Sequence, residues 1–481
     1  MLLHRTKIKI SPDRSRVIIR PFFPYHKKEN TKVIARVMSL TEKEVTQELH
    51  NVLRHFSDRH FDTEAIILSH YREIEQYMLT DIKPSKERQL LIGAYFTSEF
   101  SLESAALFNP SIVPHPDQDH VPSGSLRFIM SLRAIGEGHI SSVTFRDGII
   151  HKDNSITMEK ACQFVTTPEP LIDTEHSKKR LKDKLLEMEI ENKFTEKVSS
   201  YLPKMYTASD LKKAVRKVYE EDPRLTRKNN QARDTMKMLV QSDYQIEFYD
   251  DLPLSARVIF PNSPSERKGI EDARFVLFTS EAGEKTYYAM YTAWSGQQTL
   301  PQLLETKDFL HFKMFTLHGD SINDKGMALF PEKIDGKYAS LARQDGENMY
   351  LIYSDDIRFW REHIPLLKPS YPWEMVKVGN CGSPILIDDG WLVITHGVGP
   401  MRRYCLGAVL LDKKDPTKVI GRLKHPLLEP NENEREGYVP NVVYSCGCMA
   451  FNGKIILPYA MSDYASRIAI VDINKMLSKM Q

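Results

Sequence analysis

Short runs of alternating apolar and polar residues, separated by turns centred on glycine, occupy most of the chain. Asp-Gly or Asn-Gly pairs stand between such runs at Gly336, Gly390 and Gly453, and related turns occur at Gly124 and Gly283. These pairs are strong short-range signals for a β-hairpin, because the turn needs positive backbone φ angles. The last four glycines lie roughly 53, 54 and 63 residues apart, which is near the period of a propeller blade.

Two other regions have the helical period of apolar residues. In the region from about 40 to 107, Thr41 is expected to cap the first helix because acidic residues follow it. The region from about 156 to 243 is rich in Lys and Glu, which is typical of solvated helix faces. The apolar faces of these helices are marked, in the first region, by Val45, Leu49 and Leu53 and, in the second, by Leu211, Val215 and Val218.

The two patterns together predict an all-β core with helical additions. The long gap between Gly124 and Gly283 falls to about 70 residues once the second helical region is set aside, so five hairpins remain at similar spacing. We therefore expect a five-bladed β-propeller, although an irregular β-sandwich or two smaller β domains would give a related pattern. The predicted domains are an N-terminal extension over 1–104, largely helical from about 40, a propeller over 105–155 and 244–475, and a helical insertion over 156–243.

Composition narrows the classes of function. The chain has 481 residues, of which 41% are hydrophobic, and its formal net charge is +2. That balance predicts no nucleic-acid partner and no membrane association, and the N-terminus lacks the apolar segment of a secretory signal. The five cysteines are sparse and odd in number, so we expect reduced thiols in a cytoplasmic protein. Self-association through the helical additions is a further expectation.

Basic residues stand at the ends of several predicted strands. Arg133 follows one strand, and Lys325 and Lys377 each precede another. Each of these alone is most simply a surface charge. A propeller brings such loops to one end of its channel, where three cations would repel one another unless an anion lay between them. Phosphate suits such a group, whereas the lack of a Walker-type glycine loop argues against a nucleoside triphosphate.

Two acids and an arginine, Glu271, Asp272 and Arg274, stand immediately before an apolar strand. A surface ion pair is the simplest explanation, but ordered motifs in the surrounding sequence suggest another. The chain resembles glycoside hydrolase family 130, which comprises β-mannoside phosphorylases and some β-mannosidases on a five-bladed propeller. The resemblance rests on Gly269-Ile-Glu-Asp-Ala-Arg274, Phe330-Pro-Glu-Lys-Ile-Asp-Gly-Lys-Tyr338, Trp373-Glu-Met-Val-Lys-Val-Gly379, Gly390-Trp-Leu-Val-Ile-Thr-His-Gly397, the segment from Gly407 to Leu411 and Gly437-Tyr-Val-Pro-Asn-Val-Val443.

The resemblance covers most of residues 105–475 and implies roles for particular residues. It implies that Asp272 is the general acid and that Arg274 orients its neighbours. The phosphate-binding residues that it implies are Arg133, Lys325, Lys377, His139, Asn109 and Ser111. The substrate-binding residues that it implies are Glu271, Arg274, Tyr404, Tyr438, Asp463 and His396.

The chain departs from the family pattern at two positions and repeats it at a third. Ala273 replaces the usual proline after the acid, and Gly326 stands where many phosphorylases have a polar residue, so one phosphate contact remains open. The segment Glu221-Asp-Pro-Arg224 spells the family motif literally. It lies in a charged helical segment with no hydrophobic strand after it, so we assign the acid's role to Asp272.

One acid and several cations favour phosphorolysis over hydrolysis. A hydrolase that inverts the anomeric centre needs a second carboxylate to activate water, whereas phosphate is already anionic and needs only cations to hold it. We therefore expect an inverting phosphorylase that converts a β-mannoside oligosaccharide and inorganic phosphate into α-mannose 1-phosphate, without a metal or other cofactor. The alternatives are an inverting β-mannosidase that uses Glu137 as its second carboxylate, and a non-catalytic glycan-binding propeller.

Overall fold

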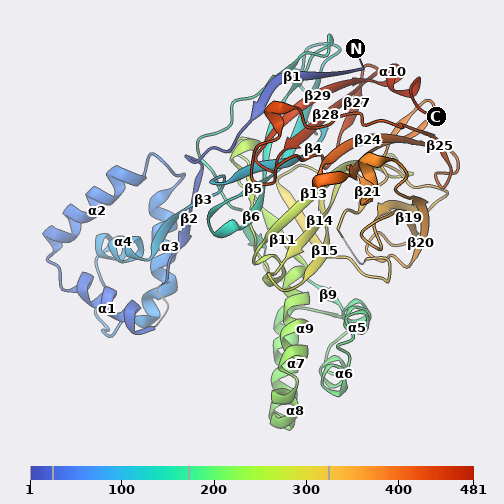
Figure 1. Ribbon diagram of the computed structural model, residues 1–481. Coiled ribbons are helices and arrows are strands. Elements are labelled where there is room, and N and C mark those ends of the chain that lie inside the picture. Colours follow the sequence, from blue (N-terminus) through green and yellow to red (C-terminus); the bar gives the residue numbers. More distant parts are fainter. Residues whose placement is uncertain (1, 24–26, 172–173, 323–324) are drawn as a thin grey trace.

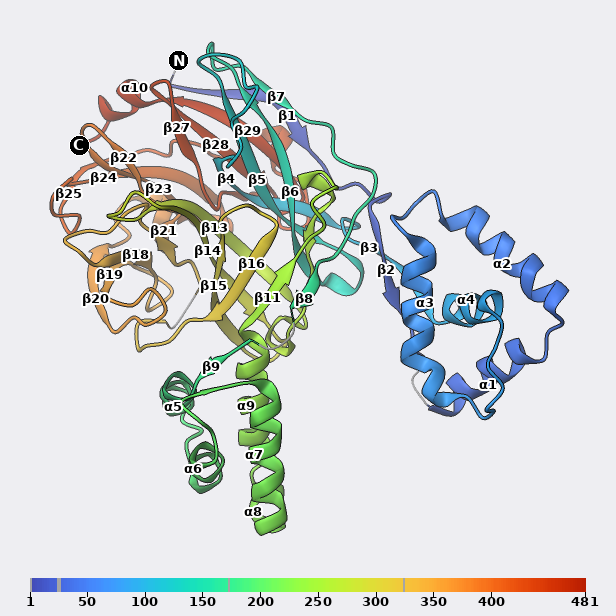
Figure 2. The ribbon, with the colours of Figure 1, turned by 180° about the vertical axis from the view of Figure 1, so that it is seen from behind.

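The computed structural model describes residues 2–23, 27–171, 174–322 and 325–481, and most of its strands fall into five antiparallel groups (Figures 1 and 2). A single parallel pairing, of Gly269 with Ser141, joins the first two groups into one sheet. The first group comprises β4 (Ala106–Pro114), β5 (Leu126–Ile135), β6 (Ser141–Ile150) and β7 (Ile156–Met158), and the second β13 (Gly269–Thr279), β14 (Lys285–Trp294), β15 (Thr299–Thr306) and β16 (His311–Thr316).

The other three groups follow in sequence order. The third comprises β17 (Ala328–Leu329), β18 (Tyr338–Ala342), β19 (Met349–Ser354) and β20 (Glu362–Leu367). The fourth comprises β21 (Lys377–Asn380), β22 (Ile385–Ile387), β23 (Gly390–Val398), β24 (Tyr404–Leu411) and β25 (Val419–Arg422). The fifth comprises β26 (Val443–Tyr444), β27 (Met449–Phe451), β28 (Lys454–Met461), β29 (Ala465–Asp472) and, from the other end of the chain, β1 (Leu3–Ile10).

The glycine turns occupy the same place in all five groups. Each glycine follows the first strand of its group, which in the fourth and fifth groups consists of two segments. It lies before the next strand or, for Gly390, at the first residue of that strand. All five residues have positive φ angles, which side chains with a Cβ atom rarely adopt. The predicted hairpins are therefore confirmed at Gly124, Gly283, Gly336, Gly390 and Gly453.

The N-terminal strand completes the fifth group. β1 pairs antiparallel with β29, so that Leu3 lies opposite Val471 (Figure 1). No strand was predicted before residue 105, although Lys7-Ile-Lys-Ile10 alternates polar and apolar residues, and the partner of β1 lies almost the whole chain away. The same region contains a second strand pair, β2 (Val17–Pro21) with β3 (Thr97–Ser101).

Between β2 and β3 the chain forms a helical lobe at the side of the strands (Figures 1 and 2). Thr41 caps the second helix through a capping box with Glu44, as the sequence predicts. Val45, Tyr71 and Leu91 are buried in a core that is separate from those of the strand groups. The helices of this lobe are α1 (Lys27–Met38), α2 (Glu42–Phe56), α3 (Thr63–Ile74) and α4 (Lys86–Tyr95).

A second set of helices projects from the second strand group (Figure 1). Leu211, Val215 and Val218 are buried in one apolar cluster with Phe275 and Phe312 of that group, so the insertion shares its core with the strands. No helix in the described part of the chain is long and apolar enough to cross a membrane. The helices of the insertion are α5 (Lys178–Glu187), α6 (Lys193–Ser200), α7 (Ala208–Glu221), α8 (Pro223–Lys228) and α9 (Asn230–Ser242), and α10 (Ile473–Leu477) follows β29.

Short strands attach the insertion to the rest of the molecule. β11 (Tyr244–Glu247) pairs with the outer strand β16 of the second group and with β8 (Glu169–Leu171). β12 (Val258–Ile259) pairs with β6 of the first group. β9 (His176–Ser177) and β10 (Met205–Tyr206) form a small pair at the base of α5.

Four glutamates whose side chains are fully buried precede the first strands of four groups. Glu266, Glu374 and Glu434 each close a capping box at a short 3-10 helix, where the carboxylate accepts backbone N–H groups. Tyrosine hydroxyls or arginines also donate to these carboxylates, as Tyr244 and Tyr291 do at Glu266 and Arg422 does at Glu374, where Oε2 has no partner among the described residues. A buried carboxylate without such partners would cost several kcal/mol, roughly, so these contacts fix how each strand begins.

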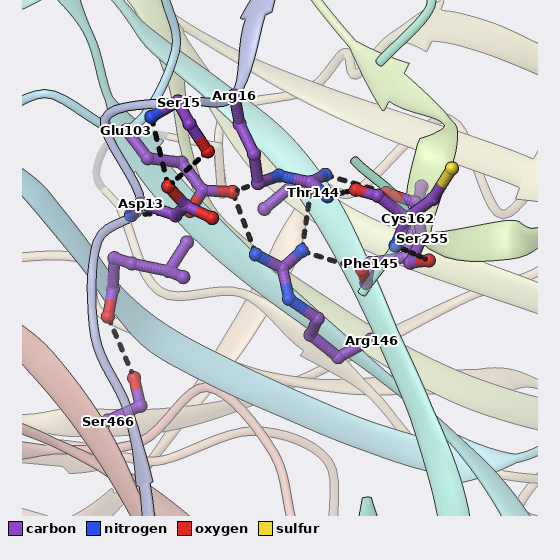
Figure 3. A network of polar contacts seen from close by, with 11 residues as sticks. Asp13, Ser15, Arg16, Glu103, Thr144, Phe145, Arg146, Cys162, Ser255 and Ser466 are labelled. Atoms are coloured by element: carbon purple, nitrogen blue, oxygen red, sulfur yellow. Dashed lines mark hydrogen bonds and ion pairs between the residues drawn. The ribbon is translucent and has the colours of Figure 1, made fainter. Parts of the chain in front are cut away.

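The fourth glutamate, Glu103, joins three distant segments of the chain (Figure 3). Its Oε1 accepts from Arg16 Nε at 2.9 Å and from Arg146 at 2.8 Å. The Arg16 guanidinium also donates to the backbone oxygens of Cys162 and Ser255, each at 2.6 Å. The network thereby ties the segment after β1 to the first strand group and to the chain that follows the insertion.

We expect Glu103→Gln to lower the free energy of unfolding by about 3–5 kcal/mol, because the change leaves two buried guanidiniums without their counter-charge. Chemical denaturation followed by circular dichroism measures the loss. Glu220→Gln is the matched control, because its 2.9 Å pair with Arg216 lies on the surface, with the two side chains 60% and 80% exposed. Equal midpoints for the two variants would contradict the importance given to the Glu103 network.

Candidate functional site

The two central residues of the site lie at irregular points of neighbouring first strands. Asn109 in β4 and Asp272 in β13 stand where the pairing register shifts, and their φ angles are 49° and 55°. Asn and Asp tolerate this left-handed conformation better than other residues with a side chain. Asn109 Nδ2 donates to Asp272 Oδ1 at 2.7 Å. Such backbone strain, of order 1–3 kcal/mol per residue, is typical of functional sites.

A spacing in the sequence relates these two residues to a third. Asn109, Asp272 and Asn380 each lie six positions after a buried glutamate, namely Glu103, Glu266 and Glu374. Because the glutamates hold the entrances to β4, β13 and β21, they bring these three polar residues to corresponding positions in three strand groups.

An ion network surrounds Asp272. Arg133 donates to Glu271 Oε1 at 2.8 Å and to Asp272 Oδ1 at 3.3 Å. Lys325 donates to the other oxygen of Glu271. The side chains of the two acids and Arg133 are only 13–17% exposed, so water screens these charges weakly. The structure thus brings together four of the predicted site residues in direct contact.

Arg274 and Ser111 make buried contacts that hold the backbone around Asp272 in place. Arg274, which is 2% exposed, donates to the backbone oxygen of Asp272 at 3.1 Å and to the Tyr444 hydroxyl at 2.7 Å. Ser111 Oγ accepts from the backbone N–H of Phe275 at 3.1 Å and so links β4 to β13. Ser111 therefore acts here as a link between strands.

The electrostatic surroundings keep Asp272 ionised. Burial alone would raise the pKa of this carboxyl, but Arg133, Arg274, the hydrogen bond from Asn109 and Lys325 together hold it below its usual range. Asp272 is therefore a carboxylate in the ligand-free protein.

A second group of predicted residues lies around Tyr404. Its ring stacks on His396 with centroids 6.1 Å apart, and Lys377 Nζ lies 5.7 Å from the ring centroid. Burial, together with Arg343, Arg274 and Lys377, holds the pKa of His396 well below its usual range, so this ring is neutral. Its Nδ1 lies 3.2 Å from the backbone oxygen of Asn380, which fixes the proton on that nitrogen.

Three predicted residues lie at the edge of the site. The rings of His139 and Tyr438 are 5.9 Å apart, and both side chains are exposed. Burial and the charge of Asp272 raise the pKa of Asp463 to about 6, although Arg133 and Arg402 oppose the shift. Glu137, the carboxylate considered for a hydrolase, is exposed.

Sequence reasoning missed Tyr444 and Arg343. Tyr444 joins the two groups, because its hydroxyl holds Arg274 and its ring lies 4.9 Å from His396. Arg343 Nε donates to the backbone oxygen of Lys325 at 3.2 Å, and a Cβ atom on Gly326 would come within 3.3 Å of that nitrogen. A signal for Arg343 was present. β5 and β18 are each the second strand of their group, and Arg343 follows β18 much as Arg133 lies near the end of β5.

The literal copy of the family motif lies elsewhere. Asp222 stands between α7 and α8, at the far end of the insertion (Figure 1). Its Oδ1 accepts from the backbone N–H of Leu225 at 2.9 Å, which is the role of a helix cap. Within the described ranges, no group of three or more His, Cys, Asp or Glu side chains is placed to hold a metal ion.

One family model and several curated relatives match this chain. The model for glycoside hydrolase family 130, described as β-1,4-mannooligosaccharide phosphorylase, matches residues 252–481. A 1,2-β-oligomannan phosphorylase from Thermoanaerobacter sp. (strain X514) is 39% identical over 225 residues, which are 46% of this chain and 74% of that protein. A β-1,2-mannobiose phosphorylase from the same strain is 37% identical over 222 residues, which are 45% of this chain and 72% of that protein.

A third relative comes from another organism, and a solved structure carries the same name. A β-1,2-mannobiose phosphorylase from Listeria innocua is 31% identical over 231 residues, which are 46% of this chain and 63% of that protein. A structure of β-1,2-mannobiose phosphorylase from Listeria innocua aligns with 79% of this chain and 92% of its own, at 21% identity and a TM-score of 0.46. That score is too low to establish a shared fold.

We expect the stability of the free protein to depend on pH through Asp463. An unfolded aspartate titrates near pH 4, so the folded protein, with the pKa at about 6, holds an extra proton between these values. Stability from this group is therefore complete below pH 4 and is lost as pH rises through 6. Asp463→Asn should stabilise the protein at pH 8 by up to about 3 kcal/mol and change little at pH 4. Thermal melts at both pH values measure this, and an equal change at each would contradict it.

Proposed function

The chain belongs to glycoside hydrolase family 130, and on that premise we propose that it is an inverting β-mannoside phosphorylase whose general acid is Asp272. The observation that carries the proposal is the cluster of Arg133, Lys325 and Arg274 around one ionised carboxylate. The curated relatives described above are all named phosphorylases of mannosides.

In the proposed reaction, inorganic phosphate is the nucleophile. A phosphate oxygen bonds to the anomeric carbon of the mannosyl unit from the face opposite the glycosidic oxygen, and the bond to that oxygen breaks with its electron pair. The leaving oxygen takes a proton that Asp272 supplies, directly or through a substrate hydroxyl. The products are α-mannose 1-phosphate and the shortened acceptor, so mass and charge balance without a cofactor.

Phosphate itself can prepare Asp272 for proton transfer. The carboxylate is ionised in the free protein because cations surround it. A phosphate dianion among Arg133, Lys325 and Lys377 would offset those cations and raise the pKa of Asp272. The general acid would thus become protonated when the nucleophile is in place.

The remaining site residues have proposed roles that follow from their contacts. We assign phosphate contacts to Arg133, Lys325 and Lys377, with His139, Asn109 and Ser111 beside them, and substrate contacts to Glu271, Arg274, Tyr404, Tyr438, Asp463 and His396. Two buried atoms near the acid, Asn109 Oδ1 and Arg133 Nε, have no protein hydrogen-bond partner among the described residues. A bound ligand or water would satisfy them, which supports a binding role.

We further propose that the five strand groups are the blades of a five-bladed propeller. Contacts between successive first strands support a closed ring. Ser111 of β4 bonds Phe275 of β13, and the N–H of Cys446, just after β26, donates to Pro110 of β4 at 2.8 Å. On this proposal the domain limits are close to those expected from the sequence, with β1 added to the last blade and β7, at 156–158, belonging to the first blade and not to the insertion.

The linkage that the enzyme cleaves is proposed to be β-1,2. Two curated relatives, at 39% and 37% identity, carry β-1,2 names. A β-1,4-mannooligosaccharide phosphorylase from Ruminococcus albus is 33% identical, over only 30% of this chain. The β-mannosidase alternative is not favoured, because Glu137 is an exposed turn residue and the named relatives are phosphorylases.

We expect cleavage of β-1,2-mannobiose to require phosphate and to yield α-mannose 1-phosphate, with β-1,4-mannobiose cleaved more slowly. Chromatography of reactions with and without phosphate measures both products. Lys377→Ala should raise the phosphate concentration at half-maximal rate about 10- to 100-fold, because one charged contact contributes about 1.5–3 kcal/mol. Free mannose released equally without phosphate, and lost in Glu137→Gln, would instead identify a β-mannosidase.

Asp272→Asn should lower turnover about 10²- to 10⁴-fold, which is the usual contribution of a general acid. The substitution keeps the shape of the side chain and its contact with Asn109, so a melting curve should show a folded protein. Asp222→Asn is the matched control in the literal motif, and it should leave turnover within about two-fold of the wild type, since the Asn oxygen can still cap α8. Loss of turnover in the control alone would reverse the assignment.

A further inference from the structure

A cavity of about 430 Å³ lies where the base of the insertion meets the outer strand of the second group. Ser177, at the start of α5, and Leu239 of α9 line one side, and Phe315 and Thr316 of β16 line the other. Its volume is in the range of small-molecule sites, roughly 300–1,000 Å³. The residues that line it are distinct from all of those described above around Asp272.

Three cations line this cavity. Arg358 lies with its guanidinium carbon 3.2 Å from the ring centroid of Phe315 and has no side-chain hydrogen bond within the described residues. Arg180 uses one nitrogen for Asp356 at 2.9 Å, and Lys184 bonds Glu187 and the backbone oxygen of Leu317, each at 2.9 Å. Burial, and then the charge of Arg180, lower the pKa of Arg358, so the two guanidiniums are close enough to repel each other.

A buried histidine beside these cations lacks a partner. His318 is 5% exposed, lines the same cavity, and its Nδ1 is buried with no hydrogen-bond partner in the described parts of the chain. Burial and the three cations hold the pKa of His318 at about 3, so the ring is neutral. A neutral imidazole can donate a hydrogen bond from Nδ1 or accept one there, and here it does neither. Such orphaned atoms in a cation-lined cavity indicate a missing ligand.

Two acids, Glu175 and Asp243, also line the cavity and distinguish it from a simple anion site. Asp243 Oδ1 accepts from the backbone N–H of Thr316 at 2.6 Å, and burial raises the pKa of this carboxyl to about 6, although Thr316, Arg358 and Arg180 oppose the shift. A carboxyl with these contacts can still accept from hydroxyl groups of a ligand. A ligand that binds both the guanidiniums and the Asp243 carboxyl needs an anionic group for the former and hydroxyl groups for the latter.

We propose that this cavity is a second binding site, for a phosphorylated monosaccharide. The phosphate lies between Arg180 and Arg358 and accepts from His318, and the sugar hydroxyls donate to Asp243. Guanidiniums bind phosphate oxygens in pairs, which relieves the repulsion between the two arginines. Binding in this cavity does not depend on the reaction at Asp272, so a result against one of the two proposals leaves the other unaffected.

Isothermal titration calorimetry of the full chain with glucose 6-phosphate tests the proposal, with glucose and inorganic phosphate as comparison ligands. The wild type should bind glucose 6-phosphate saturably at millimolar concentrations. In Lys377→Ala, which weakens the proposed phosphate site at Asp272, glucose 6-phosphate should bind more tightly than either comparison ligand. Arg358→Gln should weaken binding about 10- to 100-fold, and so should Arg180→Gln, which lies nearer the surface and guards against a folding defect.

Two controls locate the binding event. Arg216→Gln removes an exposed arginine from the same insertion and should leave the affinity within about two-fold of the wild type. Lys377→Ala, at the candidate active site, should also leave it unchanged. In protein labelled with ¹⁵N-histidine, the ring signals of His318, identified by their loss in His318→Gln, should shift as glucose 6-phosphate is added.

Several results would overturn the proposal. These are the absence of saturable binding, equal binding by glucose or by inorganic phosphate in Lys377→Ala, whose proposed phosphate contact at the candidate active site is removed, or loss of glucose 6-phosphate binding in Lys377→Ala but not in Arg358→Gln. An unmoved His318 signal at saturating ligand would do the same, because the ligand would then lie elsewhere.

Discussion

The geometry of the candidate site around Asp272 depends on glutamate carboxylates that are fully buried. Glu103, Glu266 and Glu374 are buried completely, and each fixes the start of a strand that carries a polar residue six positions later. A buried carboxylate is tolerated where charged or N–H partners compensate it, as Arg422 and two backbone N–H groups do at Glu374, so each glutamate has few arrangements open to it. The strands that begin after these glutamates are therefore held in defined positions. Asn109 and Asp272 can therefore hold strained backbone angles and still meet at hydrogen-bonding distance.

The balance of charge around Asp272 shows how the proposed phosphorylase site can be assembled from common residues. Two of the cations that lower the pKa of the acid, Arg133 and Lys325, are also proposed phosphate contacts. In the free protein Glu271 occupies two of them, Arg133 and Lys325, so their charges are already partly neutralised. The site is thereby kept stable while empty, because unpaired buried cations would repel one another.

Local patterns revealed much of this structure, whereas long-range pairings escaped them. The five glycine turns and the cap at Thr41 could be predicted because each depends on a few neighbouring residues. The pairing of β1 could not, because Lys7-Ile-Lys-Ile10 alternates as a strand does but gives no sign that its partner is β29. Among the candidate site residues, the sequence predicted the motif around Asp272 and the three basic residues, and the structure places Arg133 and Lys325 beside Glu271. Tyr444 was missed, because a lone tyrosine in an apolar run gives no sign that its hydroxyl meets Arg274.

The pairing of β1 with β29 also has a consequence for synthesis of the protein. The ribosome releases Leu3 to Ile10 long before Ala465 to Asp472, so the fifth strand group cannot form until the chain has been made as far as β29. Until then β1 is a strand with an unpaired edge, the kind of segment that associates with other chains. The helical lobe, whose core is made of local contacts, can fold in the meantime. Slow elongation would prolong the exposure of β1, so the speed of translation and the supply of chaperones would limit the yield of folded protein.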